Sequence, residues 1–140
     1  AIYSGNGKAL DYLIKKGGTY NQESIFKACR GNHQNTIDFF LKRNFDINTL
    51  GTAQGKTLLS EAARWGRINI VADLLGKGAD PDILDTDGYT ALGECIRAIP
   101  DGSPYQIDIA KILVKNGADI NRTAPYKMTP LMLALDLKNQ

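Results

Sequence analysis

Apolar side chains recur at spacings of three and four residues in four segments of the chain. Such spacing places them on one face of a helix, and glycine or asparagine follows each set, where a helix would end in a left-handed cap. The pattern predicts four amphipathic helices, which carry Leu10, Leu13 and Ile14; Ile37, Phe40 and Leu41; Ile70, Val71, Leu74 and Leu75; and Ile109, Ala110, Leu113 and Val114.

A five-residue segment follows these helices and recurs along the chain. Residues 78–82 (GADPD) return at 117–121 as GADIN, with a degenerate copy at 44–48 and a fainter one at 17–21. The degenerate copy places Asp46 where the later copies have Asp80 and Asp119. Self-similarity at a fixed period of this length is typical of repeat proteins.

A further helix is predicted on the N-terminal side of each of these amphipathic helices. Residues 57–63 match residues 90–96 at a separation of 33, and a last copy begins at Thr129 and Pro130. Threonine is a good helix N-cap, and proline is well tolerated in the first helical turn. Each unit therefore reads as a helix, a turn, a helix and a loop.

Residues 55–82 resemble an ankyrin repeat. They follow the family pattern G-x-T-P-L-H-x-A-A…G…I-V…L-L…G-A-D-P-N at most positions, and the resemblance covers nearly the whole chain. The histidine of that pattern is replaced in the four copies by Phe26, Ser60, Gly93 and Met132. The resemblance implies an all-α ankyrin-repeat solenoid of stacked helix-turn-helix units with short β-hairpin or finger loops.

We expect one domain over 1–140, with about four to five units at 1–21 (partial), 22–51, 52–84, 85–122 and 123–140 (partial). The step from Thr90 to Thr129 is longer than the step from Thr57 to Thr90, which indicates an insertion around 98–106. The partial first and last units lead us to expect a window of a longer protein.

Composition places the chain among ordinary globular domains. Its 140 residues are 43% hydrophobic and 23% charged, which excludes a disordered or collagen-like chain. Formal net charge is +2, too little to indicate nucleic acid or an anionic membrane. Two cysteines, Cys29 and Cys95, make no disulfide framework and have no paired metal-ligand spacing, so we expect a reducing cytoplasmic compartment.

Candidate catalytic and nucleotide-binding motifs are few. Residues 51–57 (GTAQGKT) resemble a phosphate-binding loop, but only three residues separate the glycines where four are needed. His33 is the only histidine and is expected to face solvent, while Cys29 is expected to be buried, which disfavours a Cys–His nucleophile. We therefore predict no catalytic residue, metal or cofactor.

The resemblance implies a protein-interaction module that binds a protein partner through a concave face, as a monomer and without a membrane. An alternative is a substrate-recruiting part of a larger enzyme or of a bacterial effector, which would place it in a host cytosol or nucleus. Nucleic-acid or nucleotide binding is a less favoured alternative.

Arginine occupies the same position in three successive units. Arg30, Arg64 and Arg97 lie one repeat apart, near the end of each first helix, which the family turns toward the concave groove. Arginine also complements a helix C-terminus, so a purely structural role stays open. Arginine with aromatic neighbours suits an acidic partner segment. The predicted partner-binding residues are Arg30, Lys56, Arg64, Trp65, Asp87, Tyr89, Arg97 and Tyr126.

Two asparagines are candidate modification sites. The family is often hydroxylated at the asparagine that ends the G-A-D-x-N segment, a position held by Asn121 and, in the degenerate copy, by Asn48. The alternative, which we favour, is an asparagine side chain that hydrogen-bonds the loop.

Overall fold

A computed structural model describes residues 7–18, 22–43, 45–51, 55–101, 104–124 and 127–138. These ranges are helical apart from turns, loops and one isolated bridge. The helices are α1 (Gly7–Lys15), α2 (Gln22–Arg30), α3 (Gln34–Leu41), α4 (Leu58–Arg64), α5 (Ile68–Gly76), α6 (Ala91–Arg97), a 3-10 turn over Ile99–Asp101, α7 (Gln106–Lys115) and α8 (Pro130–Lys138).

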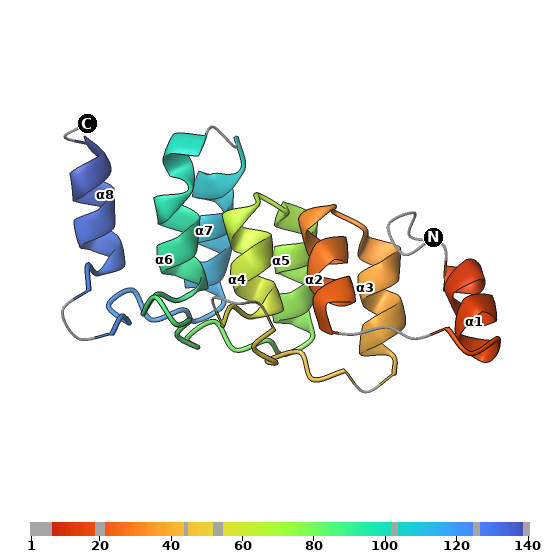
Figure 1. The fold of residues 1–140 in the computed structure, drawn as a ribbon. Coiled ribbons are helices and arrows are strands. Elements are labelled where there is room, and N and C mark those ends of the chain that lie inside the picture. Colours follow the sequence, from red (N-terminus) through yellow and green to blue (C-terminus); the bar gives the residue numbers. More distant parts are fainter. Residues whose placement is uncertain are drawn as a thin grey trace.

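The helices stack in two rows, as Figure 1 shows. One row holds α2, α4, α6 and α8, in which each helix contacts the next. The other row holds α3, α5 and α7 and is continued by α1, which packs on α3. Within each pair (α2 with α3, α4 with α5, α6 with α7) the two helices also pack on each other. This is the arrangement of a solenoid, in which each unit contacts only its neighbours.

Threonine caps mark where α4, α6 and α8 of the first row begin. The Oγ1 atoms of Thr57, Thr90 and Thr129 accept hydrogen bonds from backbone N–H groups three residues later, at 3.1, 3.3 and 3.3 Å. The predicted threonine N-caps are therefore confirmed. Gly66, with φ of 72°, forms the turn between α4 and α5, a conformation that an L-residue rarely adopts.

The core runs the length of the stack and contains apolar residues of every pair from α2/α3 to α6/α7. Both cysteines are fully buried in it. Burial raises the pKa of the Cys95 thiol to about 12 and raises that of Cys29 further. Both side chains are thus packing residues, which confirms the burial predicted for Cys29.

The loops that join one unit to the next contain no strand in the residues that the structure describes. A single antiparallel bridge joins Tyr89 to Thr123, and Gly88 accepts a backbone hydrogen bond from Ala124 at 3.0 Å. Gly88 has φ of 85°, and an Asp-Gly pair such as Asp87 and Gly88 is typical of a tight turn. No helix in the described ranges has the length and apolar character needed to cross a membrane.

Candidate protein-interaction surface

The three arginines of the repeat occupy matching places at the ends of three helices. Arg30, Arg64 and Arg97 are the last residues of α2, α4 and α6, which contact one another in sequence. Their side chains are 32%, 37% and 36% exposed. We call these three residues the arginine row.

Each arginine of the row is paired with a glutamate. Arg30 Nε lies 3.1 Å from Glu61 Oε2, and Arg64 Nη1 lies 3.3 Å from Glu94 Oε2. Glu61 and Glu94 hold the same position in successive units. Arg30 ends α2 and pairs with Glu61 of α4, and Arg64 ends α4 and pairs with Glu94 of α6. The ion pairs therefore run from unit to unit along the stack.

Sequence reasoning missed these two glutamates. Glu61 and Glu94 are 3% and 0% exposed, so each carboxylate lies beneath its arginine. The sequence does contain a pattern that indicates such pairs: a glutamate lies three residues before Arg64 and three residues before Arg97. Two further pairs are made within one helix: Arg97 Nη1 lies 2.8 Å from Glu94 Oε1, and Arg30 Nη2 lies 3.2 Å from Glu23 Oε1.

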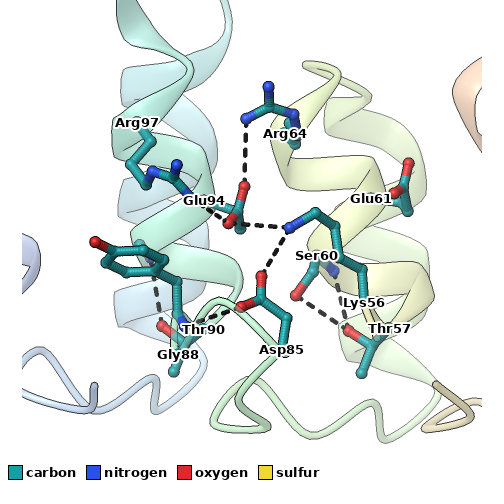
Figure 2. A network of polar contacts seen from close by, with 12 residues as sticks. Lys56, Thr57, Ser60, Glu61, Arg64, Asp85, Gly88, Thr90, Glu94 and Arg97 are labelled. Carbon is teal, nitrogen blue, oxygen red and sulfur yellow. Dashed lines mark hydrogen bonds and ion pairs between the residues drawn. The ribbon is translucent and has the colours of Figure 1, made fainter. Parts of the chain in front are cut away.

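Lys56 is not a surface anchor, which corrects the sequence prediction. Its side chain is 4% exposed, and Nζ lies 2.8 Å from Asp85 Oδ2 and 3.0 Å from Glu94 Oε1. Figure 2 shows Lys56, Arg64 and Arg97 converging on Glu94 from two neighbouring units. The lysine therefore links the units from within.

Three carboxylates near Lys56 are close enough together to suggest a metal site, but the lysine ammonium group lies between two of them. Ligand oxygens of Asp85, Asp87 and Glu94 lie within 4.8 Å of one another, but Lys56 Nζ is bonded to two of these residues. Burial opposes ionisation of Asp85. The hydrogen bonds from Lys56 and from the Tyr89 backbone N–H outweigh it and hold the pKa of Asp85 below its usual value. The arrangement favours an ion-pair cluster over a metal site.

Aromatic side chains accompany the row. Trp65 is 49% exposed at the end of α4, and its indole Nε1 donates to Glu61 Oε2 at 3.0 Å. The guanidinium of Arg97 lies over the Tyr89 ring, 4.5 Å from the centroid. Asp87 is exposed and lines a polar cavity of about 160 Å³ with Lys56, Arg64, Glu94 and Arg97. Tyr126, also predicted to bind the partner, lies outside the described residues.

The structure also places the remaining candidate residues. His33 is half buried as the N-cap of α3, which corrects the expected solvent-facing position. Cys29 is fully buried, and its Sγ donates to the Leu58 carbonyl at 3.6 Å. Because the thiolate is the reactive form and burial raises the pKa of this thiol, a Cys29–His33 nucleophile is not supported.

The two candidate asparagines differ in their contacts. Asn48 Oδ1 accepts a hydrogen bond from the backbone N–H of Asp80 in the next unit, at 2.9 Å. Asp82, which matches Asn48 one unit later, accepts in the same way from the Asp119 N–H at 2.8 Å. Asn121 is exposed, and its backbone N–H donates to Asp119 Oδ1 at 2.9 Å.

Comparison with known proteins gives the family. A family model described as ankyrin repeats in three copies matches residues 1–85. The ankyrin repeat domain-containing protein SAT10 of Stachybotrys chartarum is 34% identical over 112 residues, which cover 80% of this chain and 5% of that protein. The putative palmitoyltransferase ZDHHC13 of Danio rerio is 26% identical over 123 residues, which cover 88% of this chain and 18% of that protein.

A bacterial protein is similar over most of the chain. The putative ankyrin repeat-containing protein of Treponema pallidum is 29% identical over 128 residues, which cover 91% of this chain and 41% of that protein. The chain thus spans less than half the length of each of these three relatives. With the family model matched over residues 1–85 and the helix pairs stacked as described, the chain belongs to the ankyrin repeat family.

Proposed function

We propose that this chain is a non-catalytic protein-interaction module, and that the arginine row, with Trp65 and Tyr89, binds an acidic segment of a protein partner. Ankyrin repeats are protein-interaction modules, which supports the class of function. One observation carries the finer proposal: an arginine whose side chain is about one-third exposed ends each of α2, α4 and α6.

The burial of the charges favours an anionic ligand. Glu61 and Glu94 are almost completely buried, whereas the guanidinium groups above them are about one-third exposed. At Arg64 and Arg97 the cation is therefore the more exposed partner of each ion pair, whereas Arg30 also pairs with Glu23, whose side chain is 39% exposed. Arg64 and Arg97 pair with Glu94 through Nη1, and a guanidinium carries five N–H donors. The remaining donors suit paired recognition of a carboxylate.

The aromatic residues supply the apolar part of this surface. Interface energy concentrates in a few tryptophan, tyrosine and arginine side chains. Trp65 is half exposed beside Arg64, and the Tyr89 ring backs the Arg97 guanidinium. Each aromatic side chain is held by a polar or charged contact, so little side-chain freedom is lost when a partner binds.

Calorimetric titration with a synthetic glutamate-rich peptide that also contains tyrosine and leucine tests the proposal. Replacement of all three arginines of the row by glutamine should weaken binding about tenfold or more, the equivalent of roughly 1.4 kcal/mol. A matched control replaces three exposed cations elsewhere, Lys111, Lys115 and Arg122, with the same change in net charge. Equal weakening by both triple variants would show that only net charge matters, and undiminished binding by the row variant would reject the site.

A second candidate is a recruiting role inside a larger enzyme. The observation that favours it is the similarity to a putative palmitoyltransferase, of which this chain covers 18%. In that case a variant of the arginine row in the longer enzyme should lower turnover of the recruited protein but not of a short peptide substrate. Equal loss for both substrates would contradict this role.

Three further proposals concern the extent of the domain, its oligomeric state and its compartment. We propose that residues 1–140 form one repeat domain with the unit division given above, that the domain is monomeric, and that it works in the cytoplasm. Two buried, unpaired thiols are consistent with a reducing compartment. Nucleic-acid binding is the competing class, and it would appear as affinity for a DNA or RNA duplex that falls steeply with salt.

A further inference from the structure

The three arginines of the row are not equally neutralised. Arg30 has carboxylates on two sides, since Nε lies 3.1 Å from Glu61 Oε2 and Nη2 lies 3.2 Å from Glu23 Oε1. Two carboxylates thus face one guanidinium group at this end of the row. The carboxylate of a partner would meet an excess of negative charge at Arg30, which opposes its binding there.

The other two arginines share a single carboxylate. Arg64 Nη1 lies 3.3 Å from Glu94 Oε2, and Arg97 Nη1 lies 2.8 Å from Glu94 Oε1. Lys56 Nζ also contacts Glu94, at 3.0 Å, but Asp85 neutralises this lysine at 2.8 Å. Glu94 therefore balances only one of the two guanidinium groups. The positive charge of the row is in excess at Arg64 and Arg97.

A small polar cavity lies beside this pair of arginines. Its volume is about 160 Å³, and its lining consists of Lys56, Arg64, Asp87, Glu94 and Arg97. Figure 2 shows Arg64 and Arg97 reaching Glu94 from different sides. A water molecule takes up about 30 Å³ of liquid, so the cavity has room for about five waters or for the carboxylate end of one acidic side chain. A helix, about 10–12 Å across, is too wide to enter it.

Both guanidinium groups keep hydrogen-bond donors for a ligand. Arg64 and Arg97 contact Glu94 through Nη1, and in the described part of the chain Nε and Nη2 of both groups make no hydrogen bond or ion pair. The Tyr89 ring, 4.5 Å from the Arg97 guanidinium, helps to hold that group in place. Little side-chain freedom is then lost on binding. Two fixed N–H donors of one guanidinium match the two oxygens of a carboxylate.

Asp87 limits the negative charge that this cavity accepts. Its carboxylate lies within 4.8 Å of those of Asp85 and Glu94, and it is exposed to solvent, which screens it. The excess at Arg64 and Arg97 is one positive charge, which one carboxylate neutralises. A phosphate ester carries about −1.5 to −2 at pH 7, and Asp87 repels this additional charge. The balance of charges favours a carboxylate over a phosphate ester.

We propose, on the basis of the function proposed above, that the cavity lined by Arg64 and Arg97 binds one carboxylate of the partner, from an aspartate or glutamate side chain. Both guanidinium groups hold this carboxylate, and Arg30 takes no part in the contact. Asp87 selects against a phosphorylated side chain by repulsion. The partner residue next to Arg30 is uncharged, because Glu23 and Glu61 already neutralise that arginine.

Single variants test which arginines bind the carboxylate. The probe is the glutamate-rich peptide described above, amidated so that it has no terminal carboxylate, and the measurement is calorimetric titration. We expect Arg64→Gln and Arg97→Gln each to weaken binding about tenfold. Arg30→Gln is the matched control, because it removes the same charge from the same repeat position with similar exposure, and it should bind within about twofold of wild type.

The outcomes separate this assignment from the broader function. Equal weakening by the three variants would overturn the assignment of the carboxylate to Arg64 and Arg97, while binding by the row as a whole would stand. Absence of binding by the wild-type chain would reject the proposed function and this site with it.

Lysine variants cover the case in which a glutamine variant fails to fold. Arg64→Lys and Arg97→Lys keep a cation beside Glu94 but lack the paired donors of a guanidinium. We expect both to melt close to the wild-type temperature and to bind the peptide about threefold or more weakly. Wild-type affinity in both lysine variants would overturn recognition by paired donors.

Asp87→Asn tests the selection against phosphate. The second probe is the same peptide with its glutamates replaced one at a time by phosphoserine. We expect the variant to bind both peptides more tightly than wild type and to shift the preference toward phosphoserine about threefold or more. Asp108→Asn is the matched control, since Asp108 is exposed on α7 and does not line the cavity. Equal shifts in the two variants, or a wild-type preference for phosphoserine, would overturn the assignment of a carboxylate ligand.

Discussion

Arg67 at the start of α5 donates through Nε to the backbone carbonyl of Arg30 at the end of α2, at 2.9 Å. Its Nη2 contacts the same oxygen. Gln106, the matching residue and the first residue of α7, donates through Nε2 to the Arg64 carbonyl at 2.9 Å. A side chain at the beginning of α5 and of α7 thus satisfies a carbonyl at the C-terminal end of the preceding unit's first helix. These contacts couple neighbouring units through the backbone.

Arg67→Ala should therefore destabilise the whole stack. Loss of a charged donor to a part-buried carbonyl typically costs about 1.5–3 kcal/mol, and the effect should appear as a lower urea midpoint. Arg122→Ala is the matched control, because Arg122 Nε also donates to a backbone carbonyl, that of Asp82, but in an exposed loop. Equal midpoints for the two variants would show that burial of the Arg67 contact contributes nothing.

Lys56→Met should destabilise the protein more strongly. The substitution keeps most of the side-chain volume but removes the ammonium between Asp85 and Glu94, which are 1% and 0% exposed. Breaking a buried ion pair costs about 3–5 kcal/mol, and the two arginines that still contact Glu94 should place this variant toward the lower end. Thermal unfolding measures the effect. An unchanged melting temperature would mean that the lysine charge is dispensable inside the stack.

Acid should weaken the fold through Asp85. Its pKa is lowered in the folded state, so the unfolded chain binds a proton at a higher pH than the folded chain does. The stabilisation is complete above the ordinary aspartate pKa of about 4 and is lost as the pH falls through the lower folded value. Asp85→Asn should flatten this part of the stability curve, measured by urea unfolding between neutral and acidic pH. A parallel curve for the variant would assign the acid sensitivity to other carboxylates.

Neither cysteine should react with a thiol reagent until the chain unfolds. Cys29 and Cys95 are fully buried with raised pKa values, and the thiolate is the reactive form. Absorbance during treatment with dithiobis-nitrobenzoate at mildly alkaline pH should stay flat and then rise in denaturant to the level of both thiols. Rapid modification of the native protein would indicate that the stack opens locally around α2 or α6.

Asn121 should be the better substrate of an asparagine hydroxylase, and we keep this proposal as the less favoured of the two roles for these asparagines. Asn48 already holds the Asp80 N–H, whereas Asn121 is exposed. Protein co-expressed with such an enzyme should gain roughly 16 mass units, one oxygen atom as in a single oxidation step. The Asn121→Ala variant should not show this gain. An unmodified wild-type chain would reject the site, and equal modification of the Asn121→Ala variant would move it elsewhere.

Local signals in the sequence determined the repeat architecture. The spacing of Leu74 with Ile70 and Val71 and the cap at Thr57 depend on the geometry of single helical turns, so they can be predicted without knowledge of what each helix packs against. The step between repeats then indicates that the units stack, because a single unit cannot bury its apolar face. The position of the arginine row at three helix ends follows from the same register.

The tertiary structure alone decided which charges lie inside. Lys56 stands at the position of Tyr89 and Met128 in the repeat register, and the sequence analysis places it among the partner-binding residues. It is buried because Asp85 and Glu94, which both come from the next unit along the chain, together neutralise it. A repeat register aligns equivalent positions but does not show which side chains of neighbouring units are in contact. Burial of a charged side chain depends on those contacts, because an ion leaves water only where opposite charge and hydrogen bonds replace its hydration.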